Sequence, residues 1–135
     1  MAVMDFALSR VLPPPPAPPA GSASWSFDGS FVATRCDSQP SVVWVWDTSR
    51  LELASVLVQT RAVRATQWDP TSNRLVICTG GSKLYLWSPE GASCVHVPLP
   101  GFRAAALQWH ADGSSMLLSG RDSFCVAYIE SAATA

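Results

Sequence analysis

The chain has 135 residues, of which 48% are hydrophobic and 14% are charged, and its formal net charge is -1. This length suits one modest domain with a core, and the near-neutral charge gives no electrostatic reason to expect nucleic acid or an anionic membrane surface as a partner. The apolar runs have the length of strands, well short of the roughly 20 residues that a membrane-crossing helix needs. We therefore expect neither nucleic-acid binding nor membrane insertion.

The four cysteines are widely spaced and form no CxxC pair. They are Cys36, Cys78, Cys94 and Cys125. This pattern favours reduced, mostly buried thiols in a cytosolic or nuclear protein over disulfides or a metal site. Cys94 and His96 are the only close pair of metal-ligand types, and a zinc site would need a second pair. We predict no metal and no cofactor.

Residues 1–21 differ in kind from the rest because they hold a proline-rich segment from Pro13 to Pro19, interrupted only by Ala17. Proline donates no ladder hydrogen bond, so we predict a disordered or polyproline II leader. Arg10, Pro13 and Pro16 fit the R-x-x-P-x-x-P pattern that SH3 grooves bind. The alternative is a solvated linker without a specific partner.

A strand-like motif recurs along the remaining residues, 22–135. Residues 42–47 alternate bulky β-formers, and related segments follow at 83–88 and 124–129, each 41 residues after the last. The tryptophans of the expected first strands are Trp25, Trp68 and Trp109. The aspartates of the turns that follow are Asp28, Asp69 and Asp112. The third-strand aromatics are Trp46, Trp87 and Tyr128. Three parallel series with a period of about 40 residues indicate a repeat architecture.

Each repeat is expected to hold short antiparallel strands separated by turn residues. The expected strands are 23–27, 31–34, 42–46 and 51–58; then 65–68, 75–79, 84–87 and 93–97; then 105–109, 116–119 and 124–129. A loop is expected at 37–40, and Gly80 and Gly81 are expected to form a hairpin turn. The repeats span about 22–59, 62–99 and 102–130, and the third lacks an outer strand. These features predict an all-β, partial β-propeller of three blades.

The strand ends resemble those of the WD-repeat family, in which the third strand characteristically ends in Trp-Asp. Trp46 and Asp47 keep the dipeptide, whereas Ser88 and Ile129 replace its second member in the later copies. The family's turn aspartate is matched by Asp37 and Asp122. Its Gly-His pair is missing from all three repeats, so the resemblance does not extend to the hydrogen bonds of that histidine.

Within that family, the chain most resembles the C-terminal blades of a centrosomal member. The segments that carry this resemblance are 43–47, 68–70, 77–82 and 84–89. This resemblance implies a scaffold in a centrosomal or centriolar-satellite complex that anchors spindle microtubule minus ends and supports spindle or cilium assembly. It also implies a coiled-coil centrosomal anchoring protein and a minus-end-directed kinesin as partners. The implied location is the cytoplasm, at the cytoskeleton and centrosome.

Three repeats are fewer than the roughly 4 to 8 blades of a closed ring, so two blade faces and a strand edge would be bare. We expect a fragment or splice form of a longer protein, or a chain that completes a ring with other copies. The competing interpretation is a truncated isoform that cannot close a propeller and has no independent scaffold function.

Catalysis is not expected, because His96 and His110 have the sequence context of structural or exposed residues and no hydrolytic triad is recognisable. Core packing is the expected role of all six tryptophans. The candidate interaction residues are arginines at strand ends and turns, because arginine is favoured at interfaces. The candidates are Arg35, Arg61, Arg64, Arg103 and Arg121. The alternative is that they are solvated turn residues.

Overall fold

The computed structural model describes residues 21–129, which form three antiparallel β-sheets. The chain divides into two compact units, one up to Val63 and one from Arg64 onward. No α-helix occurs among the described residues, and the all-β, partial-propeller prediction is confirmed. The predicted leader lies outside the described residues, except for Gly21, which begins the first strand.

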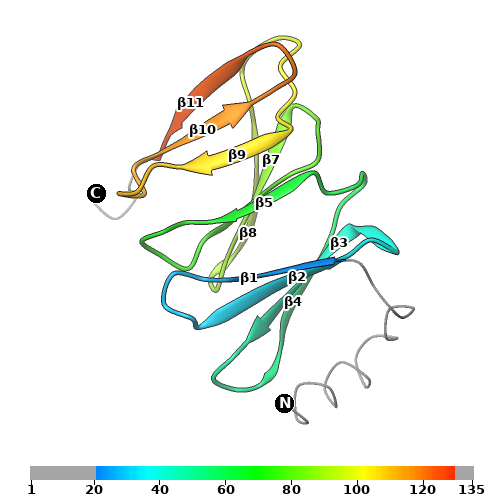
Figure 1. The fold of residues 1–135 in the computed structure, drawn as a ribbon, viewed down its shortest axis with the longest axis vertical. Coiled ribbons are helices and arrows are strands. Elements are labelled where there is room, and N and C mark those ends of the chain that lie inside the picture. The colour runs from blue at the N-terminus through cyan, green and yellow to red at the C-terminus, as the bar shows by residue number, and fades with distance from the viewer. Residues whose placement is uncertain (1–20, 130–135) are drawn as a thin grey trace. The chain divides into compact units, whose positions relative to one another are not determined.

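The first unit holds one four-stranded sheet with the strand order β1-β2-β3-β4, shown in blue to teal in Figure 1. Its strands are β1 (Gly21–Trp25), β2 (Phe31–Cys36), β3 (Gln39–Asp47) and β4 (Glu52–Val58). Because consecutive strands pair with each other, short turns suffice to connect them. Trp44 and Trp46 of β3 pack with Cys36 of β2 as a buried cluster. The indole Nε1 of Trp46 donates a hydrogen bond to Thr34 Oγ1 at 3.0 Å.

The strand bounds of the first unit differ from the predicted ones at several strand ends. The first strand ends at Trp25, because the Ser26 N–H donates to the Phe31 carbonyl and closes the turn. The predicted loop at 37–40 is shorter, since Cys36 already pairs with Gln39. Pro40 is tolerated in β3, where its carbonyl accepts a hydrogen bond from the Val63 N–H at 2.8 Å. Leu51 has a φ of 54° and belongs to the turn before β4.

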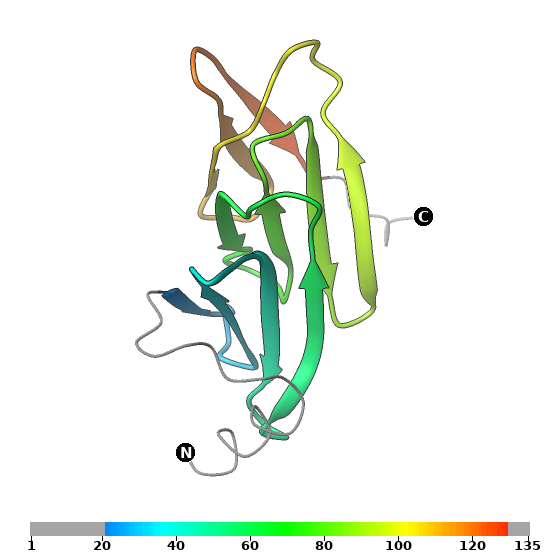
Figure 2. The same cartoon turned by 90° about the vertical axis from the view of Figure 1, so that its right-hand side faces the viewer.

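The second unit holds a four-stranded sheet and a three-stranded sheet. The four-stranded sheet consists of β5 (Ala65–Trp68), β6 (Leu75–Cys78), β7 (Lys83–Ser88) and β8 (Gly91–His96) in that order. The three-stranded sheet consists of β9 (Ala106–Trp109), β10 (Ser115–Ser119) and β11 (Phe124–Tyr128), with β10 in the middle. Figure 2 shows β8 at the outer edge of its sheet beside β7. Within the described residues the third sheet lacks a fourth strand, as predicted.

The core of the second unit is formed by aliphatic side chains from both of its sheets. Val76, Cys78, Leu107, Met116 and Leu118 belong to one buried cluster and are each no more than 6% exposed. The connection between the sheets adds Val97, Phe102 and Ala104 to it. All four residues of β6 are buried, which agrees with a strand whose two faces are both apolar. Burying such side chains contributes about 1.5–3 kcal/mol each, so this cluster dominates the stability of the unit.

Candidate functional site

The repeated aromatic residues occupy two different environments. Trp68 and Trp87 are buried in the second sheet, where their rings meet edge to face with centroids 6.1 Å apart. Trp25 and Tyr128, by contrast, are 66% and 77% exposed. Trp25 lies on β1 and Tyr128 on β11. The prediction that core packing explains every tryptophan is therefore wrong for Trp25.

Trp109 connects the two sheets of the second unit. Its Nε1 donates a hydrogen bond to the Gln67 carbonyl at 3.2 Å, and its ring packs against the core cluster. The guanidinium carbon of Arg74 lies 5.8 Å from the centre of the same ring, a distance that permits a cation–π interaction. Trp109 thus acts as a structural contact between β5 and β9.

The turn aspartates all cap the turns after the first strands, but their surroundings differ. Asp28 Oδ1 accepts a hydrogen bond from the Ser30 N–H at 2.9 Å. Asp112 Oδ1 accepts from the backbone and hydroxyl of Ser114 and lies 2.8 Å from His110 Nδ1. Those hydrogen bonds, chiefly the one from the Ser114 hydroxyl, lower the pKa of Asp112 to about 2.

Asp69 is fully buried and has the densest set of partners of the three. Its Oδ1 accepts hydrogen bonds from the N–H and hydroxyl of Thr71, and its Oδ2 accepts from Ser72 and Arg74. Burial by itself raises the pKa of Asp69, but these hydrogen bonds outweigh it and hold the pKa below its ordinary value. The arrangement is structural, since its acceptor oxygens are already engaged within the turn.

Asp47 of the Trp-Asp pair also caps a turn. Its Oδ1 accepts hydrogen bonds from the N–H and hydroxyl of Ser49 and from the N–H of Arg50. The bond from the Ser49 hydroxyl is the main reason that the pKa of Asp47 is lowered. The dipeptide therefore places a buried tryptophan beside a turn-capping carboxylate and presents no free reactive group.

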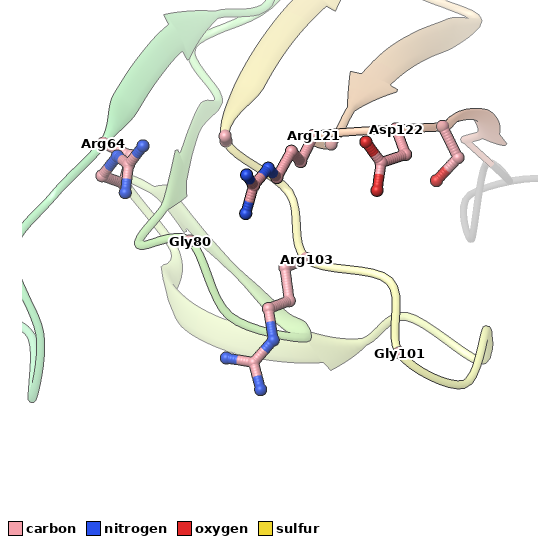
Figure 3. A pocket seen from close by; sticks show the side chains of 9 residues that line it. Arg64, Gly80, Gly101, Arg103, Arg121 and Asp122 are labelled. Atoms are coloured by element: carbon pink, nitrogen blue, oxygen red, sulfur yellow. The ribbon is translucent and has the colours of Figure 1, made fainter.

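Three of the five candidate arginines line one cavity of about 500 Å³ in the second unit. They are Arg64, Arg103 and Arg121, and Figure 3 shows that they come from three separate segments around the cavity. Arg64 precedes β5, Arg103 lies in the connection between β8 and β9, and Arg121 lies in the turn between β10 and β11. We take this cavity as the candidate functional site and name it the arginine cavity.

Backbone hydrogen bonds at the ends of the sheets hold these three segments. The Arg64 N–H donates to the Cys78 carbonyl at 2.8 Å, which fixes the entry to β5 against the end of β6. The Ala104 N–H donates to the Gly81 carbonyl at 3.1 Å. The Gly120 N–H donates to the Ser123 carbonyl at 2.7 Å and closes the turn that carries Arg121. The arginine backbones are thus positioned by the sheets before any ligand binds.

Two glycines allow the segments to approach closely. Gly80 has a φ of 78°, as the predicted hairpin turn requires, and a Cβ there would lie 3.4 Å from the Cγ and Nη1 atoms of Arg64. A Cβ on Gly120 would lie 2.9 Å from the Arg103 carbonyl oxygen. Turn chemistry predicts the glycines, but their role in bringing the arginines together is visible only in the structure.

The arginine cavity carries an excess of positive charge. Among the residues that the structure describes, no ion pair and no side-chain hydrogen bond engages Arg64, Arg103 or Arg121, and all three are exposed. Asp122 is the one acidic side chain of the lining, and Ser123 adds a hydroxyl. The sequence patterns indicate neither residue as part of an interaction site, although Asp122 matches the family's turn aspartate. Guanidinium groups in this setting can bind oxyanions but supply no nucleophile or general base.

The other candidate residues do not belong to this cavity. Arg35 is engaged within the first unit, where its Nε donates to Ser22 Oγ at 3.2 Å and its Nη1 to the Val63 carbonyl at 3.3 Å. Arg61 is exposed in the segment after β4. The SH3-type residues Arg10, Pro13 and Pro16 lie outside the described residues.

No group of three or more His, Cys, Asp and Glu side chains is placed to hold a metal ion between residues 21 and 129. Across the same range, no helix has the length and apolar character needed to cross a membrane.

Comparison with known proteins links the chain to WD-repeat proteins. It is 47% identical over 113 residues to the mouse WD repeat-containing protein WRAP73, an alignment that covers 82% of this chain and 24% of that protein. A WD repeat-containing protein of Schizosaccharomyces pombe is 29% identical over 135 residues, covering 84% of this chain and 28% of the relative. Rat echinoderm microtubule-associated protein-like 1 is 39% identical over 71 residues, which is 52% of this chain and 9% of that protein. No family model matches the sequence.

The fold agrees with this relationship. A chain in the crystal structure of the mitotic checkpoint complex superposes with a TM-score of 0.63 at 16% identity, covering 81% of this chain and 37% of that one. The three sheets, their repeat spacing and these relatives show that the chain belongs to the WD-repeat family of β-propeller proteins. It spans about a quarter of the length of the two curated relatives that it matches over most of its sequence.

Proposed function

We propose that the chain is a non-catalytic protein-interaction scaffold whose contact site is the arginine cavity. The observation that carries the proposal is the presence of three exposed, unpaired guanidinium groups on turns at the ends of rigid sheets. Arginine is enriched at protein interfaces, and loops held by a rigid scaffold are common binding elements. The scaffold role also suits a fold whose repeated tryptophans and aspartates serve packing and turn formation.

We further propose that this scaffold works at the centrosome or centriolar satellites, in a complex that anchors spindle microtubule minus ends and supports spindle or cilium assembly. A coiled-coil anchoring protein and a minus-end-directed kinesin are the proposed partners. The support is the resemblance to a centrosomal WD-repeat protein and the similarity to a relative whose name describes a microtubule-associated protein-like chain.

Proximity labelling in dividing cells tests this proposal. The whole chain, fused to a labelling enzyme, is expected to enrich centrosomal and spindle-pole proteins over the labelling enzyme alone. Recovery of cytosolic proteins only, with the fusion stably expressed, would contradict the centrosomal proposal.

A thermal melt of the purified chain distinguishes the scaffold from the competing interpretation, which is a truncated isoform without independent scaffold function. A scaffold predicts a cooperative transition, because the buried clusters are lost together on unfolding. A gradual, non-cooperative loss of β-sheet circular dichroism would favour the truncated isoform.

A further inference from the structure

We propose that the arginine cavity binds an acidic peptide segment of a partner protein by engaging the oxyanions of its side chains. This inference deepens the proposed scaffold function and rests on it. It begins from three arginines, Arg64, Arg103 and Arg121, that line one cavity and whose side chains have no anionic partner in the described structure (Figure 3).

The chemistry of the lining favours oxyanions over other ligands. A guanidinium presents a planar fork of N–H donors that matches the two oxygens of a carboxylate or phosphate, and such charge-assisted bonds are stronger than neutral ones. Three like charges around one cavity repel each other, and a bound anion relieves that repulsion.

The size of the cavity favours a peptide over nucleic acid. A volume of about 500 Å³ lies in the range of ligand pockets of about 300–1,000 Å³ and accommodates a few side chains. Nucleic-acid binding depends on a basic stripe that neutralises many successive phosphates. This chain has 9 Lys and Arg residues against 10 Asp and Glu residues, so it has no overall excess of positive charge of the kind that nucleic-acid binding needs.

Asp122 makes the charge of the cavity asymmetric. It lines the cavity next to Arg121 in the sequence, so its carboxylate repels an anion bound on that side. We therefore infer that the acidic side chains of the peptide sit toward Arg64 and Arg103. Removing the Asp122 charge should strengthen binding, whereas removing an arginine should weaken it.

Fluorescence anisotropy with the whole chain tests the proposal. The probes are a short glutamate-rich peptide, its glutamine counterpart, a serine peptide in phosphorylated and unphosphorylated forms, and a single-stranded RNA of similar length. We expect the glutamate or phosphoserine probe to bind at least about 10-fold more tightly than its neutral counterpart, with the preferred probe identifying the natural oxyanion. Added salt should weaken the interaction.

The variants separate local recognition from general charge. Arg64→Gln and Arg103→Gln should each weaken binding of the acidic probe by about 10-fold, and Arg103→Lys should recover part of that loss because it keeps the charge but loses the fork. Asp122→Asn should tighten binding by about 2- to 5-fold. Arg50→Gln is the control for general charge, because Arg50 is exposed, forms ion pairs with Asp47 and Glu52 and does not line the cavity.

Several outcomes overturn the inference. They are the absence of measurable binding by both acidic probes, equal binding of the neutral probes, tighter binding of the RNA, and an equal loss for Arg50→Gln. Circular dichroism of each variant shows whether a loss reflects unfolding, and Asp122→Asn provides a gain that unfolding cannot mimic. If the peptides fail while proximity labelling still recovers spindle-pole proteins, the scaffold proposal stands and only the arginine cavity is excluded as its contact site.

Discussion

Two turns of the second unit start from similar sequence chemistry and end in different environments. Asp69 follows β5 and Asp112 follows β9, and each carboxylate accepts hydrogen bonds from the residue two positions later. Asp69 is fully buried and also pairs with Arg74 at 2.6 Å, whereas Asp112 is exposed beside His110. The same capping hydrogen bonds thus stabilise a buried turn at Asp69 and an exposed turn at Asp112.

The largest expected effect is that of Asp69→Asn. The asparagine can keep an acceptor for Thr71, but its amide nitrogen replaces the oxygen that accepts from Ser72 and Arg74. Breaking a buried ion pair is strongly unfavourable, and we expect the free energy of unfolding to fall by about 3 kcal/mol. Urea unfolding of the whole chain measures this change.

Asp112→Asn is the control for that substitution. It should lower stability much less, because water replaces the lost interactions at an exposed carboxylate. Equal losses for Asp69→Asn and Asp112→Asn would contradict the difference between the two turns.

Gly113→Ala tests the contact between these turns. A Cβ on Gly113 would collide with Thr71 Oγ1 and lie 2.8 Å from Asp69 Oδ1, and the φ of 73° adds backbone strain. We expect a loss of about 2–3 kcal/mol in the free energy of unfolding. Gly101→Ala is a matched control, because its φ is 76° but its Cβ would meet nothing within 4 Å.

Backbone strain alone should therefore lower the free energy of unfolding of Gly101→Ala by about 1 kcal/mol in the same urea experiment. The difference between the two alanine variants measures the crowding of the Asp69 turn. Indistinguishable losses would show that the turns do not pack as closely as the structure indicates.

Trp109→Phe removes a smaller link between the two sheets. The phenylalanine loses the hydrogen bond to the Gln67 carbonyl and weakens the interaction with Arg74. A loss of about 1 kcal/mol is expected from thermal or urea unfolding. Trp25→Phe, at a position that is 66% exposed, should change stability by less than about 0.5 kcal/mol.

The last expected effect is a dependence of stability on acidic pH. The pKa of Asp69 is lowered in the folded chain from its ordinary value of 3.8, so the unfolded state takes up a proton first as the pH falls. This contribution is fully present above the unfolded-state pKa and is lost as the pH falls through the folded-state pKa. Asp112, with a folded pKa of about 2, adds a change of the same sign.

Melting temperatures measured at decreasing pH should therefore fall below about pH 4 in the wild-type chain. Asp69→Asn should show a shallower fall, because its side chain at this position no longer titrates. A slope as steep as that of the wild-type chain would exclude Asp69 as a source of the acid sensitivity.

The strand pattern was predictable because it is local. Alternating bulky residues bounded by turn chemistry place β5 at Ala65–Trp68 as expected, and Leu53, Ser55 and Leu57 share the less exposed face of β4. The errors arise where a hydrogen bond or a backbone angle decides the strand end, as at Ser26, Pro40 and Leu51. Periodicity does not encode those choices.

Burial and the candidate site were less predictable because they depend on which segments meet. The repeat pattern makes Trp25 equivalent to Trp68, yet one is exposed and the other buried. Five arginines have the same sequence context at strand ends, but Arg35 is engaged by Ser22 and Val63, and only three line the cavity. A single sequence carries no signal that separates these cases.

By itself, the sequence determined the class of fold, the number of repeats and the absence of a recognisable catalytic motif, since all three depend on residue order over short distances. Only the tertiary structure decided that Asp69 is a buried structural carboxylate and that Arg64, Arg103 and Arg121 share one cavity. The physical reason is that burial and charge clustering depend on contacts between segments far apart in the sequence, which the pairing of strands and the packing between sheets bring together.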